Sequence, residues 1–338
     1  MPSAPIAITM GEPAGIGGEL AIAAWQTLRN EGPPFLLLDD PCRIRALATS
    51  LGAHVDIATI ADADEARAAF HAAIPIMPLT RPVPLAPGSP TPSTASAVLE
   101  SIETAVALAR GGHVAAMVTS PIQKATLQDA GFPYPGHTEY LAALAGVPRT
   151  VMMLSGPDLR VVPVTVHVAL ANVPARLSID AIVETTRILH RALEEDFALK
   201  APRIAACGLN PHAGEEGRMG REEIETIVPA LEILRKEGID ITGPHPADTM
   251  FHPRARARYH AALCMYHDQA LVPLKTIAFD EGVNVTLGLP FVRTSPDHGT
   301  ALDIAGRGLA RPESLIAAIR LASDLAGRRN RPSSETTR

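Results

Sequence analysis

The chain has 338 residues, of which 46% are apolar and 20% are charged, and its formal net charge is −6. This is the composition of an ordinary globular protein with enough residues for one large or two medium domains. The negative balance argues against a nucleic-acid-binding or membrane-surface protein, because both classes carry a basic footprint.

Short apolar runs alternate with helical patterns along most of the chain. The first predicted strand is Ile6–Met10, followed by a helix at Glu19–Leu28 and a second strand at Phe35–Leu38. Further strands are predicted at Ala115–Val118, Val161–Val166, Ile204–Cys207, Ala261–Met265 and Val283–Thr286. Strands separated by helices imply right-handed crossovers and a mainly parallel sheet with helices on both faces.

The clearest helical pattern spans Ile179–Leu193. Apolar or β-branched side chains recur there at helical spacing, at Ile182, Thr186, Leu189 and Leu193. Ser178 stands directly before this run and is a suitable N-cap.

Two segments depart from this alternation. Residues 75–92 contain seven prolines, which predicts an extended surface connection and neither a strand nor a helix. The polar tail RRNRPSSETTR, residues 328–338, is predicted to be disordered.

The compartment follows from what the sequence lacks. No apolar run reaches the length of about 18 residues that a membrane span needs. The start MPSAPIAITMGEP does not have the basic and apolar regions of a signal peptide. The three cysteines, Cys42, Cys207 and Cys264, are far apart and odd in number, which favours a reducing compartment over a disulfide framework. We therefore expect a cytoplasmic protein.

Three histidines stand at or shortly after the ends of predicted strands. His167 follows the run VVPVTV, His212 lies in NPHAGE after IAAC, and His267 lies in YHDQ after AALCM. The carboxyl ends of parallel strands share one edge of a sheet, so the three rings would emerge there together. Three imidazoles suit a catalytic divalent metal. The chain has twelve histidines, however, and their placement alone leaves open that these are ordinary polar or core residues.

A second group of residues has the chemistry of an oxyanion site. His137 and Thr138 lie in PGHTEYLA, and Lys275, Asn284 and Arg293 lie in a loop-rich stretch with several glycines and prolines. A lysine point charge, a forked arginine and small polar donors are the groups that bind phosphate. A single Lys or Arg is usually a solvated surface charge, and the setting among turns favours a binding role.

The segment GEPAGIGGEL resembles a dinucleotide-binding turn, and the next strand leads to Asp39. The pattern fails, because Leu20 stands where the third glycine is required. A tight strand-to-helix turn is the simpler interpretation. No G-x-S-x-G elbow is present for serine hydrolase chemistry.

Together these segments resemble the 4-hydroxythreonine-4-phosphate dehydrogenase family of pyridoxal phosphate biosynthesis. The likeness runs from ITMGEPAGIG to DHGTALDIAG, and its most specific blocks are PGHTEYLA, VHVALANVPARLS, GLNPHAGEEGRMGREE, GPHPADTMF, YHDQALVPLK and VNVTLGLPFVRTSPDHGTALDIAG. Gly18, where a proline is common, and Gln123, where a small polar residue is usual, are the departures.

The resemblance implies a three-layer α/β/α fold similar to the isocitrate and isopropylmalate dehydrogenases, with two domains around a central cleft. Residues 1–130 with 300–327 would form the first domain, and residues 131–299 the second, with the metal ligands and dimer contacts. It also implies a homodimer whose active site lies at the subunit interface. The implied metal ligands are His167, His212 and His267, and the implied substrate contacts, largely to the phosphate, are His137, Thr138, Lys275, Asn284 and Arg293.

The implied reaction is NAD(P)-dependent oxidation of 4-phosphooxy-L-threonine, with one divalent metal (Zn, Mg or Co) per site as Lewis acid. Asp248 and Asp268 are candidates for a general base or for partners that orient a ligand histidine, and the residues that bind the cofactor are unknown. Alternatives are dehydrogenation of a sugar-acid phosphate such as threonate or erythronate 4-phosphate, dehydrogenation of an aromatic dihydrodiol, a metallohydrolase, and a non-catalytic phosphate-binding protein.

Overall fold

The computed structural model describes residues 4–329, which fold into two compact units. Unit 1 comprises residues up to 149 together with those from 289, and unit 2 comprises residues 150–288. The sequence-based division placed these boundaries at 130/131 and 299/300. Of the predicted tail, Arg328 and Arg329 are the last residues of a helix, and residues 330–338 lie outside the described part.

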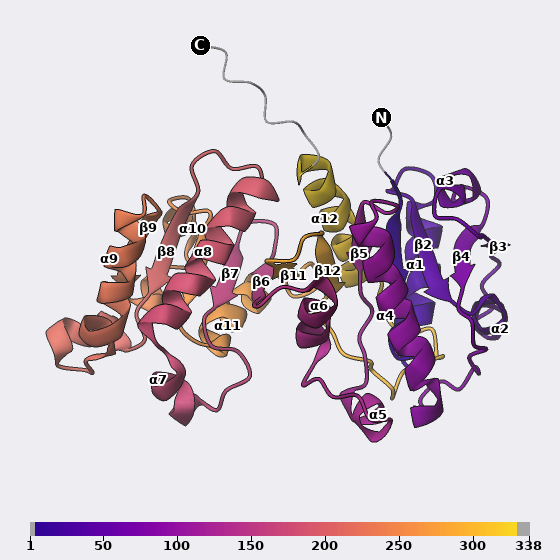
Figure 1. Ribbon diagram of the computed structural model, residues 1–338, viewed down its shortest axis with the longest axis horizontal. Coiled ribbons are helices and arrows are strands. Elements are labelled where there is room, and N and C mark those ends of the chain that lie inside the picture. The colour runs from indigo at the N-terminus through magenta and orange to yellow at the C-terminus, as the bar shows by residue number, and fades with distance from the viewer. Residues whose placement is uncertain (1–3, 330–338) are drawn as a thin grey trace, which may run out of the picture. The chain divides into compact units, whose positions relative to one another are not determined.

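Unit 1 contains a parallel sheet in the order β3-β4-β2-β1-β5-β12 (Figure 1). Its strands are β1 (Ile6–Thr9), β2 (Phe35–Asp39), β3 (Ile57–Thr59), β4 (Ile74–Pro78), β5 (Ala116–Val118) and β12 (Arg293–Pro296). Its helices are α1 (Gly17–Leu28), α2 (Pro41–Ser50), α3 (Glu65–Ala69), α4 (Ala95–Arg110), α5 (Lys124–Asp129), α6 (His137–Ala145) and α12 (Glu313–Arg329).

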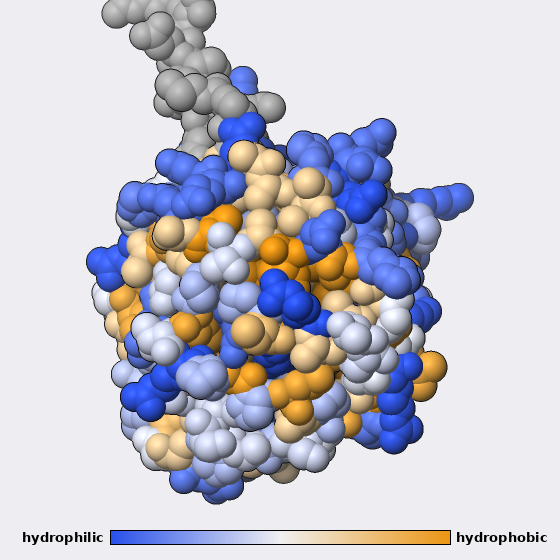
Figure 2. Space-filling view, turned by 90° about the vertical axis from the view of Figure 1, so that its right-hand side faces the viewer, coloured by the Kyte–Doolittle hydropathy of each residue, from blue (hydrophilic) through white to orange (hydrophobic). Residues whose placement is uncertain are grey.

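Helices cover both faces of this sheet. On one face α4 and α6 pack against the alternate strand residues Ala7, Leu36 and Met117, which are all buried. The long helix α12 packs against β12, β5 and α1 and so belongs to the opposite layer. This gives the expected α/β/α layering. On the face drawn in Figure 2, hydrophilic and hydrophobic side chains are interspersed.

Unit 2 contains a mixed sheet in the order β11-β6-β7-β10-β8-β9. Its strands are β6 (Val151–Ser155), β7 (Arg160–Pro163), β8 (Arg203–Cys207), β9 (Asp240–His245), β10 (Ala261–Cys264) and β11 (Val283–Leu287). Its helices are α7 (Val173–Arg176), α8 (Ile179–Glu195), α9 (Val228–Lys236), α10 (Pro253–Arg256) and α11 (His267–Ala278).

In unit 2, α8 and α9 pack together on one side, and α11 packs on a core of β7, β8 and β10 residues. Strands β7, β10, β8 and β9 run parallel to one another. β6 runs antiparallel to both β7 and β11, so the mainly parallel arrangement predicted from sequence holds with this exception.

The α/β class and the strands predicted from apolar runs are confirmed to within a few residues. The predicted N-cap is confirmed as well, since Ser178 Oγ accepts a hydrogen bond from the Ala181 amide at 3.1 Å. Within the described residues, no helix has the length and apolar character required to cross a bilayer.

The prediction for residues 75–92 was wrong at both ends. Residues 75–78 belong to β4, and Pro92 opens a 3₁₀ turn that leads into α4. Proline removes an amide donor but its φ is compatible with extended backbone. Ile74 and Ile76 alternate with Pro75 and are fully buried, so their burial stabilises a strand despite the prolines.

Candidate functional site

The three candidate metal ligands all belong to unit 2 and follow neighbouring parallel strands. β10 lies between β7 and β8, with Ala262 opposite Val161 and Ala261 opposite Ile204. His267 is the first residue of α11, directly after β10 and a two-residue link. The strand ends therefore lie at one edge of the sheet, as the sequence predicted.

His167 and His267 are brought side by side. Thr165 holds the end of β7 against the end of β10, because its hydroxyl donates to the Met265 carbonyl at 2.8 Å and its amide donates to the same oxygen. The two imidazole centroids are 5.9 Å apart, with an interplanar angle of 43°. Both rings line a pocket of about 280 Å³ that also includes Leu170 and Tyr266.

Asp268 fixes the orientation of His267. Its carboxylate Oδ1 lies 2.7 Å from His267 Nδ1, and the Asp268 side chain is otherwise largely exposed. A carboxylate on Nδ1 leaves Nε2 of the same ring as the atom that can bind a metal, the usual arrangement for a ligating histidine. Asp248, the other acidic candidate, is exposed in the 3₁₀ turn Ala247–Thr249.

His212 is not among the residues that line the pocket beside His167 and His267. It is exposed in the turn Pro211–Gly217, which follows β8. The described residues contain no group of three or more histidine, cysteine or acidic side chains able to hold a metal ion. One chain thus presents His167 and His267 together and His212 separately, and whether the three form one site stays a prediction.

The turn that carries His212 has an uncommon backbone. Residues 212–216 all have positive φ, between 41° and 81°, and only Gly214 among them is a glycine. For other L-residues the left-handed conformation costs about 1–2 kcal/mol each. The neighbouring structure must therefore hold this turn in place.

Gln269 connects the strand ends that precede His212 and His267. Its Nε2 donates to the Gly208 carbonyl at 2.7 Å, and its Oε1 accepts from the Met265 amide at 2.7 Å. The side chain is buried, so both amide groups are satisfied away from solvent. Sequence reasoning missed Gln269, although its place in YHDQ, two residues after a candidate ligand, is a usable signal.

Three of the substrate candidates, His137, Thr138 and Arg293, form a cluster in unit 1. His137 and Thr138 occupy the first turn of α6, whose N-cap, Gly136, provides no side-chain cap. Arg293 comes from β12, and its guanidinium donates to Thr119 Oγ1 from Nε at 3.1 Å and from Nη2 at 2.5 Å. An uncapped helix start presents backbone amides that attract anions.

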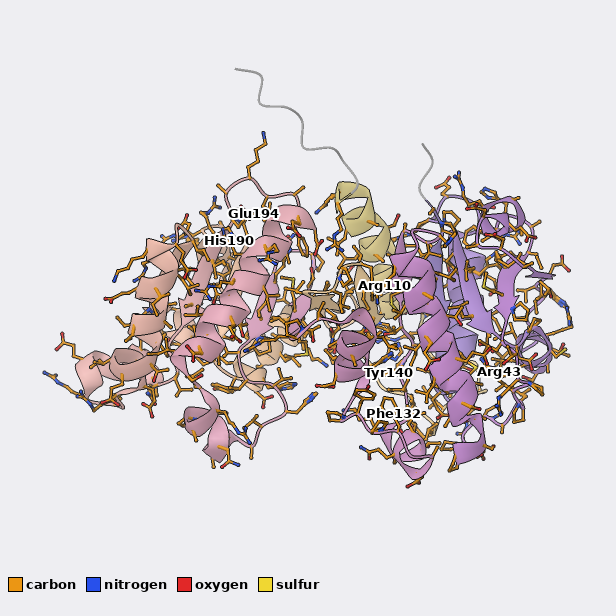
Figure 3. All side chains as sticks on the ribbon, in the orientation of Figure 1. Arg43, Arg110, Phe132, Tyr140, His190 and Glu194 are labelled. Atoms are coloured by element: carbon orange, nitrogen blue, oxygen red, sulfur yellow. The ribbon has the colours of Figure 1, made fainter. Side chains whose placement is uncertain are left out.

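The aromatic residues around α6 fix the position of its first turn. Tyr140 donates its hydroxyl proton to Glu103 Oε1 on α4 at 2.5 Å, and its ring packs edge-on against Phe132 at a centroid distance of 5.0 Å (Figure 3). Burial, followed by the hydrogen bond to Glu103, raises the pKa of Tyr140, so the hydroxyl remains a donor at neutral pH. This packing holds His137 at a fixed place in unit 1.

The electrostatics of this cluster suit an anion. Burial lowers the pKa of Arg293 to about 10, which leaves it cationic at neutral pH. Burial, then the charges of Arg293 and Lys124, hold the pKa of His137 well below its usual value, so the ring is neutral. His137 Nε2 is shielded from solvent and has no hydrogen-bond partner among residues 4–329.

Lys124 is a member of this cluster that sequence reasoning missed. Its Nζ lies 3.6 Å from the point where a Cβ on Gly136 would stand, which places the ammonium at the N-terminus of α6. The remaining substrate candidates belong to unit 2, where Lys275 lies on α11, with its Nζ 5.8 Å from the Phe279 ring centroid, and Asn284 lies half-buried in β11.

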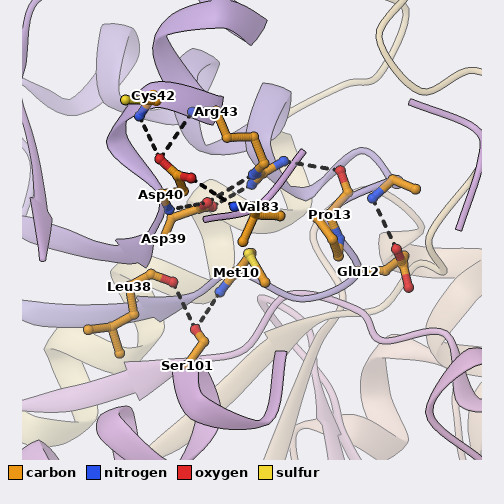
Figure 4. Close-up of polar contacts among 11 residues, drawn as sticks. Met10, Glu12, Pro13, Leu38, Asp39, Asp40, Cys42, Arg43, Val83 and Ser101 are labelled. Atoms are coloured by element: carbon orange, nitrogen blue, oxygen red, sulfur yellow. Dashed lines mark hydrogen bonds and ion pairs between the residues drawn. The ribbon is translucent and has the colours of Figure 1, made fainter. Parts of the chain in front are cut away.

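The glycine-rich segment before α1 is a packed turn. Asp39, the acid expected of a dinucleotide site, forms a buried ion pair with Arg43, which also donates to the Pro13 carbonyl at 3.0 Å (Figure 4). Its carboxylate is therefore occupied by a structural contact. Gly18, a departure from the family pattern, packs close to the same guanidinium. A Cβ added to Gly18 would lie 3.3 Å from it.

Comparison with known proteins identifies relatives along nearly the whole chain. The sequence model of the family described as pyridoxal phosphate biosynthetic protein PdxA matches residues 33–322. A 4-hydroxythreonine-4-phosphate dehydrogenase of Methylorubrum extorquens is 54% identical over 332 residues, with 96% of this chain and 95% of the relative covered. One from Caulobacter vibrioides is 50% identical and covers 97% of this chain and 99% of its own.

Solved structures agree with these matches. A 4-hydroxythreonine-4-phosphate dehydrogenase from Klebsiella pneumoniae superimposes with a TM-score of 0.86 at 37% identity, covering 96% of this chain and all of that one. A terephthalate 1,2-cis-dihydrodiol dehydrogenase from Burkholderia xenovorans is less similar, with a TM-score of 0.65 at 28% identity over 95% and 98% of the two chains. The chain belongs to the PdxA family, and relatives that are 50% and 54% identical to it carry the name 4-hydroxythreonine-4-phosphate dehydrogenase.

Proposed function

We propose that this protein oxidises 4-phosphooxy-L-threonine with NAD(P)⁺ in the biosynthesis of pyridoxine 5′-phosphate. The secondary hydroxyl becomes a ketone, giving 2-amino-3-oxo-4-phosphooxybutanoate, NAD(P)H and a proton. The keto acid then loses carbon dioxide to form 3-amino-2-oxopropyl phosphate. One observation carries the proposal: a cluster suited to phosphate, built from the buried Arg293, the neutral His137 and Lys124, occurs in a chain that matches, over nearly its whole length, dehydrogenases named for this phosphorylated substrate.

The phosphate would bind in unit 1. Arg293 provides a forked guanidinium already oriented by Thr119, and Lys124 provides a second positive charge at the start of α6. His137 remains neutral and can donate from one ring nitrogen, and the uncapped amides of the first turn of α6 add further donors. We assign Thr138, Lys275 and Asn284 to the same substrate as further contacts.

We propose that His167, His212 and His267 hold a divalent cation, zinc, magnesium or cobalt. The donor set is chemically suitable, since three neutral imidazoles form a common catalytic site. The hydrogen bond between Asp268 and His267 is the partner that such a ligand needs. When bound, the cation supplies Lewis acidity that stabilises negative charge on the reacting alcohol oxygen.

Asp268 orients His267 in this proposal and is not the proton acceptor. Its Oδ1 already forms a hydrogen bond with the ring, whereas Asp248 is exposed and stays a candidate for the general base.

We also propose a cytoplasmic location. The three cysteines are free thiols, and Cys207 and Cys264 form no disulfide although Cys207 Sγ donates to Cys264 Sγ at 3.8 Å, as expected in a reducing compartment.

The reaction is tested by the absorbance of NAD(P)H. We expect purified protein to reduce NAD(P)⁺ in the presence of 4-phosphooxy-L-threonine, and chelation followed by desalting to remove this activity until a divalent cation is restored. Threonate and erythronate 4-phosphates and an aromatic dihydrodiol serve as competing substrates. A higher kcat/KM for one of them would indicate that this compound, and not 4-phosphooxy-L-threonine, is the substrate. Turnover without nicotinamide would indicate a hydrolase.

We further propose that the protein is a homodimer in which His212 completes the metal site of the partner subunit. The arrangement within one chain supports this, because His167 and His267 are adjacent and His212 is exposed elsewhere in the same unit. A symmetric interface would then build two identical sites from shared parts.

Mixing inactive variants tests the shared site. A heterodimer of a His212→Ala chain and a His267→Ala chain contains one site with both defects and one with neither. We expect it to regain about half of the wild-type activity. His167→Ala mixed with His267→Ala is the matched control, since both rings serve the same subunit's site and each site keeps one defect. Absence of recovery in verified heterodimers of the first pair, or recovery in the second, contradicts this assignment.

A further inference from the structure

The turn that carries His212 is held from inside by a single buried carboxylate, that of Glu223. Among residues 4–329 its side chain is one of the few buried acidic groups, with a relative exposure of 3%. Glu223 Oε1 accepts hydrogen bonds from the backbone amides of Leu209 and Asn210, both at 2.8 Å. Its Oε2 accepts from Asn210 Nδ2 at 2.9 Å. These hydrogen bonds fix the backbone of Leu209 and Asn210, the two residues that precede the turn.

The carboxylate also packs closely against the turn itself. A Cβ on Gly214 would stand 2.5 Å from Glu223 Oε2, and a Cβ on Gly208 would stand 3.1 Å from Oε1. No side chain fits at Gly214, whose φ of +81° is in any case unfavourable for other residues. The left-handed segment 212–216 therefore packs directly against the Glu223 carboxylate at Gly214.

Glu223 is itself anchored to the rigid part of unit 2. It opens a π-helical turn, Glu223–Ile227, in which Ile227 is fully buried and which continues directly into α9. α9 packs against α8 and β9. Such π-turns are infrequent and often occur at functional sites. Glu223 thus connects α9, and with it the sheet and its helices, to the His212 turn, and Glu222 Oε2 adds a hydrogen bond from Asn210 Nδ2 at 2.7 Å.

We propose that Glu223 is the positioning residue that holds the Pro211–Gly217 turn in its left-handed conformation and so presents His212 as a metal ligand. This inference rests on the proposed role of His212. Glu223 contacts the backbone and Asn210, not the ring, so its effect on the metal passes through the conformation of the turn.

The test is a double-mutant cycle read as metal affinity of the purified dimer, measured with Co²⁺ or Zn²⁺ against a chromophoric chelator. Glu223→Ala should weaken binding by about 10- to 100-fold, the usual effect of losing a group that orients a ligand. Combined with His212→Ala, it should cause no further loss, because both changes disable the same ligand. Glu225→Gln is the control, since Glu225 belongs to the same π-turn but is exposed and pairs with Arg221.

Hydrogen exchange gives a readout independent of the metal. Glu223→Ala should speed exchange of the Leu209 and Asn210 amides, whereas Glu225→Gln should not. If Glu223→Ala does not fold, two milder variants carry the test. Glu223→Gln keeps the shape of the side chain but faces Asn210 Nδ2 with a second donor, and Gly214→Ala forces the turn away from the carboxylate.

The outcomes separate the two proposals. If His212→Ala leaves metal affinity unchanged, the assignment of His212 as a ligand fails, whatever Glu223 does. If His212→Ala weakens binding and neither Glu223 variant does, the positioning role is overturned while the metal site stands. Additive losses in the double variant also overturn it, because they show that Glu223 acts on the metal by a route other than His212.

Discussion

Replacing His212 by alanine should remove nearly all turnover while leaving the fold intact. The side chain is exposed in a surface turn, so its loss opens no cavity in the core. Two remaining imidazoles hold a divalent cation weakly. Losing the Lewis acid raises the barrier by roughly 4 kcal/mol or more, which corresponds to a fall in kcat of roughly 10³-fold.

The measurement is kcat at saturating substrate, with metal content determined on the same sample. His190→Ala is the matched control, because His190 is a histidine of the same unit that pairs with Glu194 on the surface of α8 (Figure 3). Circular dichroism establishes that both variants fold. Full activity of His212→Ala in a verified metal-free preparation would refute the three-histidine site.

Replacing Arg293 by alanine should lower kcat/KM for phosphorylated substrate and leave kcat/KM for an unphosphorylated analogue unchanged. The guanidinium is buried, and a substrate phosphate at this place would be bound away from water. Truncating one partner of such a charge pair costs about 2–5 kcal/mol, or about 30-fold or more in kcat/KM. We expect most of the change in KM, since the phosphate lies away from the reacting hydroxyl.

Comparing two substrates isolates this contribution. The variant and the wild type are assayed with 4-phosphooxy-L-threonine and with the unphosphorylated analogue, and the loss should appear only with the former. Arg45→Ala, which removes an exposed arginine from α2 of the same unit, should change neither. An equal loss with both substrates would show that Arg293 maintains the structure of unit 1 and does not bind phosphate.

How much of the fold could be predicted depends on what stabilises each strand. Strands such as β5 and β10 are uniformly apolar and buried, so their sequence alone identifies them. β12 is also buried, but it reads Arg-Thr-Ser-Pro, and its polar groups are satisfied by distant partners, such as the Ala318 carbonyl that accepts from Thr294 Oγ1 at 2.9 Å. A strand of this kind has no apolar pattern from which it could be predicted.

The candidate site shows the same division. The order of strands and histidines in the sequence was enough to place His167 and His267 at one edge of the sheet. It could not place His212, because the direction of its ring depends on a run of positive φ angles that four non-glycine residues adopt. Lys124 was missed because a single lysine after a short loop looks like any solvated charge until α6 is seen beside it.

The path of the chain through the two units has a consequence for its synthesis. The first part of unit 1 precedes unit 2 in the chain, but β12 and α12, which cover β5, are translated after unit 2. Unit 2 is continuous from 150 to 288 and can close its sheet as soon as it leaves the ribosome. Until β12 and α12 have been synthesised, β5 remains an unpaired edge of the unit 1 sheet, and such an edge can pair with strands of other chains. A nascent chain arrested near residue 288 should therefore be a preferred client of chaperones, and one that includes α12 should not.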